Sequence, residues 1–121
     1  MSLDTKEFAL KAVRLLNEKK AVDVILLEIG PISVIADYFL ICHGNSKIQT
    51  KALSDHILES LPDEEYSLLR MEGYRDASWI LVDFGTLVIH IFIPEERSFY
   101  NLERLWGGAR VIDLQYLSAA P

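Results

Sequence analysis

The stretch WILVDFGTLVIHIFI, which runs from Trp79 to Ile93, decides the fold of this chain. It contains two apolar runs, 78–84 and 87–93, separated by Gly85 and Thr86. A two-residue connection that contains glycine, placed between two apolar runs, is typical of a β-hairpin. The sequence therefore predicts two antiparallel strands joined by a tight turn.

Side chains alternate between the two faces of such a hairpin. The loop could be Phe84-Gly85 or Gly85-Thr86, and both registers place the same side chains on the same faces. One face is uniformly apolar and is expected to be core: Ile80, Val82, Phe84, Leu87, Ile89, Ile91 and Ile93. The other face is amphipathic: Trp79, Leu81, Asp83, Val88, His90 and Phe92. This second face either packs under one of the protein's own helices or stays partly open for a partner.

The flanking sequence predicts further helices and strands on both sides of the hairpin. A helix at 4–20 is indicated by Asp4 and Glu7, which form a capping box, and by an apolar stripe: Phe8, Ala12, Leu15 and Leu16. Strands are predicted at 22–29 and 38–42, and a shorter, mixed-polarity strand at 66–71.

A second helix is predicted over 46–61, between a capping box of Ser46 and Gln49 and a stop at Pro62. Its expected buried residues are Ile48, Ala52, Leu53, Ile57 and Leu61. The order of elements predicts an α/β fold, a mixed sheet of about five strands flanked by helices, in one domain over 1–121. A chain of 121 residues is close to the commonest size of a single domain.

The amino-acid composition and the net charge of the chain argue against some classes of function. Half of the residues are apolar, and the longest apolar runs are far shorter than the roughly 20 residues that a membrane span needs. The N-terminus lacks the features of a secretion signal, so a cytoplasmic location is expected. The net charge of −6 opposes binding to nucleic acid and suits a basic protein partner better.

Candidate catalytic and metal-binding residues do not cluster in the sequence. Three aspartates, Asp37, Asp76 and Asp83, are isolated, whereas nucleotidyl transfer needs carboxylates that hold a metal pair. Three histidines (His43, His56 and His90) and Cys42 show no spacing typical of metal ligands. Cys42 and His43 are neighbours on a predicted strand, so they point to opposite faces, and Cys42 is expected in the core. The interpretation is a protein without catalysis, metal or cofactor.

The segment after Pro94 predicts a terminal helix that begins at Glu95 and Glu96. Four apolar side chains are expected on one face of that helix, where they would close the core: Phe99, Leu102, Leu105 and Trp106. The other side carries Tyr100, Glu103 and Arg104. A tyrosine and an arginine on an exposed helix beside Trp79 indicate a contact patch for a partner.

A series of motifs covers residues 4–106 and is specific as a combination. It comprises Ala36-Asp37-Tyr38-Phe39, Ile41-Cys42, Gly44-Asn45-Ser46, Glu72-Gly73-Tyr74, residues 79–85, Val88-Ile89-His90-Ile91-Phe92, Pro94-Glu95-Glu96-Arg97 and Tyr100-Asn101-Leu102-Glu103-Arg104-Leu105-Trp106. In these motifs the chain resembles the ribosomal silencing factor family, also called the Iojap-related family. Residues 107–121 extend beyond the shared motifs.

This resemblance implies a fold similar to nucleotidyltransferases without their catalytic carboxylates. It also implies binding to the large ribosomal subunit through its protein number fourteen, which blocks joining with the small subunit and represses translation when nutrients are limited. The residues expected to contact the partner are first Trp79, Tyr100 and Leu102, and then His90, Asp83, Glu103, Arg104 and Trp106.

Two departures from the family pattern and two hypotheses remain. His43 stands where many relatives have a small hydroxyl residue, and the extension carries apolar residues: Val111, Ile112, Leu114, Tyr116 and Leu117. A homodimer through the sheet edge or hairpin is one hypothesis. The alternative function is a divergent nucleotidyltransferase-like protein that binds a nucleotide near Gly44, Ser46 and Asp83.

Overall fold

The computed structural model describes residues 5–61 and 67–115. In chain order, the elements are α1 (Thr5–Glu18), β1 (Val22–Glu28), β2 (Tyr38–His43), α2 (Lys47–Ser60), β3 (Arg70–Glu72), β4 (Trp79–Asp83), β5 (Leu87–Phe92), α3 (Pro94–Tyr100), α4 (Leu102–Leu105) and β6 (Arg110–Val111). The helix and strands that the sequence predicts up to residue 43 are present within two residues of the expected bounds wherever these are described. Asp4, Pro62, Tyr66, Tyr116 and Leu117 lie outside the described residues.

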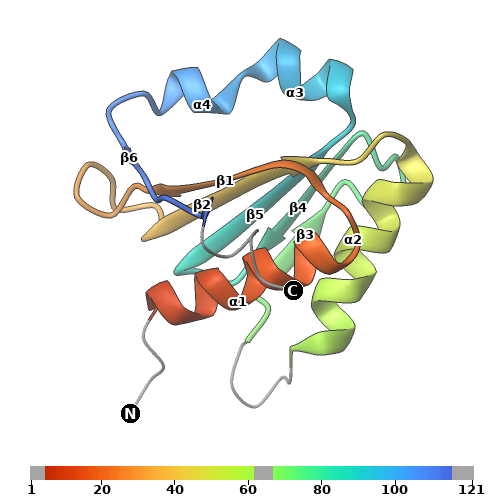
Figure 1. The fold of residues 1–121 in the computed structure, drawn as a ribbon, viewed down its shortest axis with the longest axis horizontal. Coiled ribbons are helices and arrows are strands. Elements are labelled where there is room, and N and C mark those ends of the chain that lie inside the picture. Colours follow the sequence, from red (N-terminus) through yellow and green to blue (C-terminus); the bar gives the residue numbers. More distant parts are fainter. Residues whose placement is uncertain (1–4, 62–66, 116–121) are drawn as a thin grey trace.

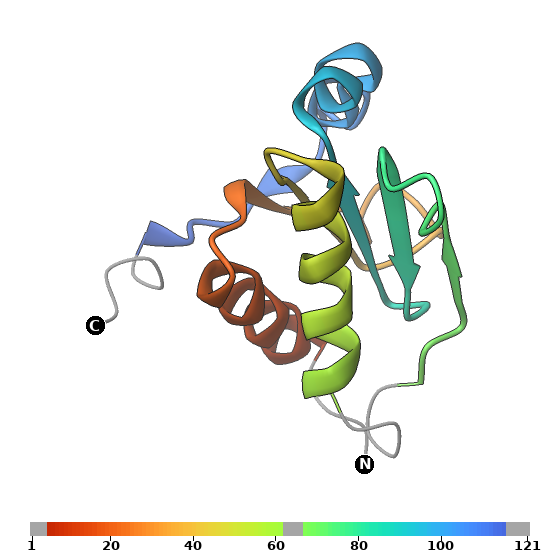
Figure 2. The ribbon, with the colours of Figure 1, turned by 90° about the vertical axis from the view of Figure 1, so that its right-hand side faces the viewer.

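A mixed sheet forms the centre of the molecule, with the strand order β3-β4-β5-β2-β1-β6. The pair β2 and β5 is parallel, and the other neighbouring strands are antiparallel. Helices α1 and α2 cover one face of the sheet, whereas α3 and α4 lie over the other (Figures 1 and 2). The predicted α/β class is confirmed. The sixth strand of the described sheet, β6, is too short to leave a periodic pattern in the sequence.

The hairpin is present, and its register is settled. Asp83 pairs with Val88, and the amide of Phe84 donates to the carbonyl of Leu87 at 2.9 Å, so the loop is Gly85-Thr86. Gly85 has a φ of 86°, a backbone conformation that favours glycine. The expected apolar face is buried under α1 and α2, apart from Ile93, which is half-buried at the start of α3.

The second face of the hairpin also packs against the protein's own helices over most of its length. Its buried cluster joins residues of β1 and the position just after it, and of β2, β5 and α4: Leu27, Ile29, Phe39, Ile41, Val88, Phe92 and Leu102. Trp79 and Leu81 are partly buried against this cluster. The molecule therefore has two apolar layers, one on each side of the sheet, and the smaller layer lies under α3 and α4.

Helix α2 is rotated relative to the sequence prediction. Ile48 is 83% exposed and Ala52 is also exposed, whereas Thr50 and Ser54 are buried together with Leu53 and Ile57. The buried hydroxyls satisfy themselves on carbonyl groups: Oγ1 of Thr50 lies 2.7 Å from the Ala77 oxygen. Hydroxyl groups in a helix can donate hydrogen bonds to backbone carbonyls. Thr50 and Ser54 can therefore be buried, although the apolar pattern predicts burial of Ile48 and Ala52 instead.

The tail is two short helices instead of one. Asn101 separates α3 from α4 and adopts the left-handed conformation, with φ 47° and ψ 60°. This residue rotates α4 relative to α3, so the three- and four-residue spacing of the predicted stripe does not continue across it. Leu102 is buried and Trp106 is half-buried, but Phe99 and Leu105 are 79% and 72% exposed, contrary to prediction.

Candidate protein-docking site

Trp79 and Tyr100 form an aromatic pair at the surface. Trp79 begins β4 and Tyr100 ends α3, and their ring centroids lie 4.7 Å apart. Behind them the buried ring of Phe92 lies 4.9 Å from Trp79. Tyr100 is 46% exposed and Trp79 is half-buried. Such rings offer a large apolar area with a polar end and few torsions to restrict on binding.

The buried side chain of His90 contacts the Trp79 ring from the interior of the protein. The indole Nε1–H of Trp79 donates to Nδ1 of His90 at 3.2 Å, and His90 is 4% exposed. Burial lowers the pKa of His90 to about 4, because the protein interior disfavours the charged form. The imidazole is therefore neutral near pH 7, with Nδ1 as acceptor and the proton on Nε2. This bond fixes the orientation of the Trp79 side chain.

Exposed apolar residues extend this surface along α3 and α4. Phe99 lies 5.0 Å from Tyr100, and both Phe99 and Leu105 are largely exposed. A hollow of about 560 Å³ lies among them; it is lined by Ser98, Phe99, Tyr100, Asn101, Arg104 and Leu105. We call Trp79, Phe99, Tyr100, Arg104 and Leu105 the aromatic surface. Exposed apolar residues gathered in this way are typical of a site that binds another macromolecule.

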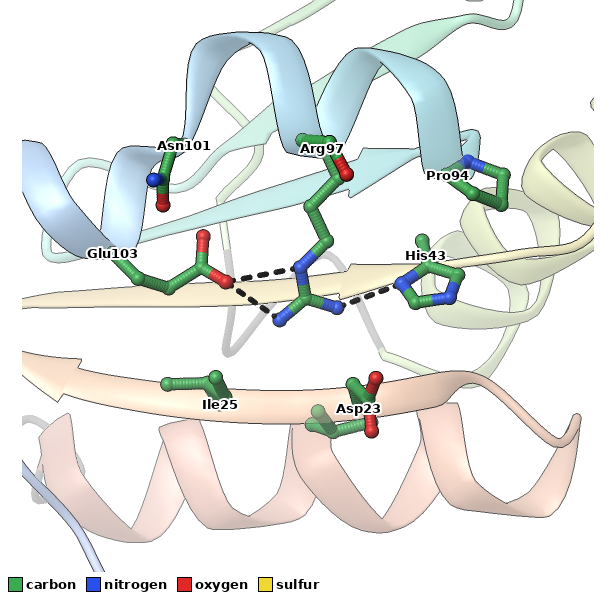
Figure 3. Close-up of a pocket in the computed structure, with 9 residues that line it drawn as sticks. Asp23, Ile25, His43, Pro94, Arg97, Asn101 and Glu103 are labelled. Atoms are coloured by element: carbon green, nitrogen blue, oxygen red, sulfur yellow. Dashed lines mark hydrogen bonds and ion pairs between the residues drawn. The ribbon is translucent and has the colours of Figure 1, made fainter.

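A second hollow, between α3 and the strands β1 and β2, contains a buried arginine (Figure 3). Arg97 is 8% exposed; its Nε and Nη2 donate to Oε2 of Glu103 at 3.1 and 3.0 Å. Nη1 lies 2.9 Å from Nδ1 of His43 and donates to the Val22 carbonyl at 3.3 Å. This cavity of about 560 Å³ is also lined by Asp23, Ile25, Pro94 and Asn101, among others.

His43 and Cys42 have opposite environments, as their alternation predicts. Burial, and then the positive charge of Arg97, lowers the pKa of His43, so its neutral ring accepts the hydrogen bond from Arg97. Cys42 faces the other side of the sheet and is fully buried in the larger apolar layer. Burial raises the pKa of its thiol to about 12, and the group stays protonated. The two residues do not form a catalytic pair.

The structure brings some of the predicted contact residues together and separates others. Arg104 is exposed on the aromatic surface, and Trp106 packs edge-on against Phe39, 5.3 Å away. Leu102 is 8% exposed beneath α4, and Glu103 holds Arg97. These positions favour packing for Leu102, His90 and Glu103, and surface contact for Trp79, Tyr100 and Arg104.

Asp83 lies at the far end of β4 from Trp79. They are four positions apart along the strand, or about 13 Å at 3.3 Å per residue. The carboxylate of Asp83 accepts hydrogen bonds from the Gly85 amide at 2.8 Å and from Nε of Arg70 at 3.1 Å. Its bonds thus serve the hairpin turn and the neighbouring strand β3.

The same register separates the two parts of the alternative nucleotide site. Gly44 and Ser46 follow the end of β2 that pairs with Phe92, whereas Asp83 lies beside Val88 at the other end of β5. Ser46 caps α2 by accepting the Gln49 amide at 3.1 Å, and the Gln49 side chain accepts the Asn45 amide at 2.7 Å. The reciprocal bond of a full capping box is thus displaced by one residue. In residues 5–61 and 67–115, no three His, Cys, Asp or Glu side chains gather in a way that could hold a metal ion.

Arg97 is the residue of this region that the sequence prediction left out. It stands in the sequence only within the motif Pro94-Glu95-Glu96-Arg97. Its spacing of six residues from Glu103 crosses the left-handed Asn101 and matches no helical contact rule. The ion pair could be found only from the tertiary structure.

A mixed α/β domain with exposed apolar residues gathered on one surface has the geometry expected of a domain that binds another macromolecule. The family model described as "Ribosomal silencing factor during starvation" matches residues 2–121. The chain belongs to this family, which confirms the resemblance that the motifs carry. Family membership assigns it a role in ribosome silencing, which is regulatory in kind.

Individual relatives agree with this assignment. A Bacillus subtilis protein named "Ribosomal silencing factor RsfS" is 45% identical over 100 residues, 83% of this chain and 85% of the relative. A mouse (Mus musculus) relative named "Mitochondrial assembly of ribosomal large subunit protein 1" is 33% identical over 97 residues, 78% of this chain and 42% of the relative. A crystal structure of a Chromobacterium violaceum protein superposes with a TM-score of 0.83 at 28% identity, covering 87% of this chain and 88% of that one. In the described residues, every helix is too short or too polar to cross a membrane.

Proposed function

We propose that the protein docks on the large ribosomal subunit through that subunit's protein number fourteen and thereby prevents the small subunit from joining. The observation that carries this proposal is the exposed pair of Trp79 and Tyr100, whose rings lie 4.7 Å apart. Large apolar rings flanked by an arginine are the commonest anchors of protein interfaces. The name of the mouse relative, which refers to assembly of the ribosomal large subunit, also supports a large-subunit partner.

The charge of the protein supports a basic protein as the surface that is contacted. A net charge of −6 repels ribosomal RNA, whose phosphates favour Lys-rich and Arg-rich proteins. It attracts a basic protein patch and raises the rate of encounter with it. Docking on a ribosomal protein is therefore favoured over docking on the exposed RNA.

The mechanism is steric exclusion. Once bound at the face that meets the small subunit, the protein occupies volume that the joined ribosome needs, and no covalent step is required. Repression then lasts as long as the protein stays bound, so the rate of dissociation sets its duration. In the cytoplasm of a nutrient-limited cell, this lowers the number of translating ribosomes.

The experiment is a subunit-joining assay with purified large and small subunits, followed by light scattering. The wild-type protein should slow joining, and Tyr100→Ala and Trp79→Ala should restore it. Ile48→Ala is the control, because Ile48 is also an exposed apolar residue but lies on α2, on the other side of the sheet. If the wild-type protein leaves the joining rate unchanged, the proposal fails.

A second measurement separates docking from folding. Tyr100 is about half exposed, so Tyr100→Ala should leave the melting temperature nearly unchanged. Binding of this variant to isolated large subunits is then measured by co-sedimentation. Tight binding by a folded Tyr100→Ala variant would show that the aromatic surface is not the docking site, even if subunit joining is blocked.

A further inference from the structure

Helix α3 is held to the sheet by a single buried side chain. Within Pro94–Tyr100, all of which the structure describes, Arg97 is the one buried residue. The neighbours Ser98, Phe99 and Tyr100 are exposed, so they add little apolar packing beneath the helix. The guanidinium instead contacts three separate elements: Glu103 of α4, His43 of β2 and the Val22 carbonyl of β1. Four hydrogen bonds therefore fix the height and rotation of α3.

The same row of the sheet carries Arg97's partners at one end and Trp79 at the other. Val22 pairs with His43, His43 with Phe92, and Phe92 with Trp79. Arg97 bonds the first two residues of this row, while Tyr100, three residues later on α3, contacts Trp79. The anchor and the aromatic pair thus share one rigid support.

The backbone connects the anchor to Tyr100 over a very short distance. The carbonyl of Arg97 accepts the Asn101 amide at 2.8 Å, and Asn101 then turns into the left-handed conformation that ends α3. Tyr100 lies between these two fixed points. Its ring direction is therefore decided by where Arg97 holds the helix and where Asn101 ends it.

We propose that Arg97 is a positioning residue, which sets the ring of Tyr100 against Trp79 so that the aromatic surface is formed before the partner arrives. It acts through Tyr100 and does not touch the partner, because its side chain is 8% exposed and its guanidinium points toward the sheet (Figure 3). This inference rests on the proposed docking function of Tyr100. An interface that is ordered in advance binds more tightly, since fewer torsions are restricted on association.

A neutral side chain at position 97 cannot replace the buried positive charge of Arg97. Removing the guanidinium leaves Glu103 as a partly buried carboxylate without its counterion, and His43 without its donor. Lysine cannot replace it fully, because an ammonium group lacks the planar fork that bonds Glu103 through two nitrogens. Arg97→Lys is therefore expected to act in the same direction as Arg97→Met, with a smaller effect.

The test is a double-mutant cycle on binding to isolated large subunits. Wild type, Arg97→Met, Tyr100→Ala and the double variant are compared by their dissociation constants. Arg97→Met should weaken binding about tenfold in the wild-type background and by less than about twofold when Tyr100 is already alanine, because coupled residues are not additive. Arg14→Met is the control: Arg14 is exposed on α1, behind the opposite face of the sheet, and this variant should bind as wild type does.

A spectroscopic measurement accompanies the cycle in the free protein. The indole N–H resonance of Trp79 reports the ring current of Tyr100, so Arg97→Met should shift it toward its position in Tyr100→Ala, whereas Arg14→Met should not. If Arg97→Met does not fold, Glu103→Gln takes its place in the same cycle, because it weakens the same ion pair and retains the side-chain shape.

The outcomes are distinguishable from those of the proposed function. If Tyr100→Ala binds normally, the docking surface itself is wrong. If Tyr100→Ala weakens binding but folded Arg97→Met does not, Arg97 has no positioning role. A tenfold loss from Arg97→Met that persists in full in the Tyr100→Ala background would likewise overturn the inference, because Arg97 would then act independently of Tyr100.

Discussion

The indole of Trp79 on β4 and the imidazole of His90 on β5 are diagonal neighbours across the two strands and share a hydrogen bond of 3.2 Å. The bond links the partly exposed ring of Trp79 to the buried ring of His90. The position of Trp79 at the surface is therefore restricted by a residue of the core. It also makes the orientation of Trp79 depend on a group that can be protonated. Protonation would turn Nδ1 from an acceptor into a donor that faces the indole donor.

The burial of His90 in its neutral form predicts an acid-dependent loss of stability. The pKa of His90 in the folded protein is about 4, below its ordinary value of 6.5, so the unfolded chain binds more protons between these two values. The stability from the neutral form is complete above about pH 6.5 and is lost as pH falls toward 4. A pKa lowered from 6.5 to about 4 corresponds to about 3 kcal/mol. Urea unfolding at several pH values measures this loss.

His90→Asn provides the comparison, because asparagine can accept the Trp79 hydrogen bond but does not titrate. The difference between the two pH profiles isolates His90 from the carboxylates that also titrate in acid. His56→Asn is a second control, since His56 is nearer the surface and bonds Glu18 at 2.8 Å. Parallel profiles for wild type and His90→Asn would contradict the prediction.

Gly73 is predicted to tolerate no side chain. Its φ is 80°, and a Cβ at this position would lie 2.0 Å from the carbonyl oxygen of Trp79. The left-handed backbone alone costs about 1–2 kcal/mol for a residue with a Cβ, and the contact adds to it. Gly73→Ala should therefore destabilise by more than about 2 kcal/mol in thermal or urea unfolding and should disturb the start of β4.

Gly108→Ala is the matched control for that substitution. A Cβ at Gly108 meets its nearest neighbour, Cδ1 of Ile32, at 3.7 Å, which is an ordinary contact. The change in stability should stay within about 0.5 kcal/mol. Equal effects of the two substitutions would show that the geometry around Gly73 is not as described.

Leu102→Ala separates packing from partner contact at a residue that the motif pattern assigns to the partner. Leu102 is 8% exposed and belongs to the smaller apolar layer. Its truncation should destabilise by about 2–4 kcal/mol, in the range for buried leucines. Circular dichroism during heating measures this effect, and Leu105→Ala, which removes a similar but exposed side chain, should be nearly neutral. A stable Leu102→Ala variant that loses subunit binding would support direct contact instead.

The proposed docking should be sensitive to salt in its association rate. The protein carries a net charge of −6 and the proposed partner is basic, so attraction over a distance assists their encounter. Raising the salt concentration from 0.05 to 0.5 M, values chosen for the assay, shortens the screening length to below about 10 Å. Association with large subunits, followed by stopped flow, should slow by more than dissociation accelerates. Equal rates at both concentrations would indicate that charge does not guide binding.

The local sequence was sufficient for much of the fold. The hairpin, its faces, the capped start of α2 and the burial of Cys42 all follow from the alternation of side chains and from turn residues within a few positions of one another. Prediction was weaker for α2, where Thr50 and Ser54 occupy core positions that an apolar count gives to Ile48 and Ala52. Hydroxyls that bond to nearby carbonyls conceal their burial from any hydropathy pattern.

The candidate site also has features that the sequence predicts and features that it does not predict. The sequence predicts Tyr100 and Arg104 on an exposed helix beside Trp79, and the structure places the rings of Tyr100 and Trp79 4.7 Å apart. The exposure of Phe99 and Leu105 was not predicted, because the left-handed Asn101 rotates one helix against the other. A single backbone residue in an unusual conformation is enough to turn a predicted core stripe toward solvent.

The sequence by itself determined which side chains share a face of the hairpin, because alternation along a strand is a local property that is the same for both possible two-residue loops. Only the tertiary structure decided how α3 is held, since Arg97 finds Val22 at a separation of 75 residues and His43 at 54. A buried charge is stable only where partners from several elements converge. That convergence depends on the order of the strands in the sheet, which no local pattern contains.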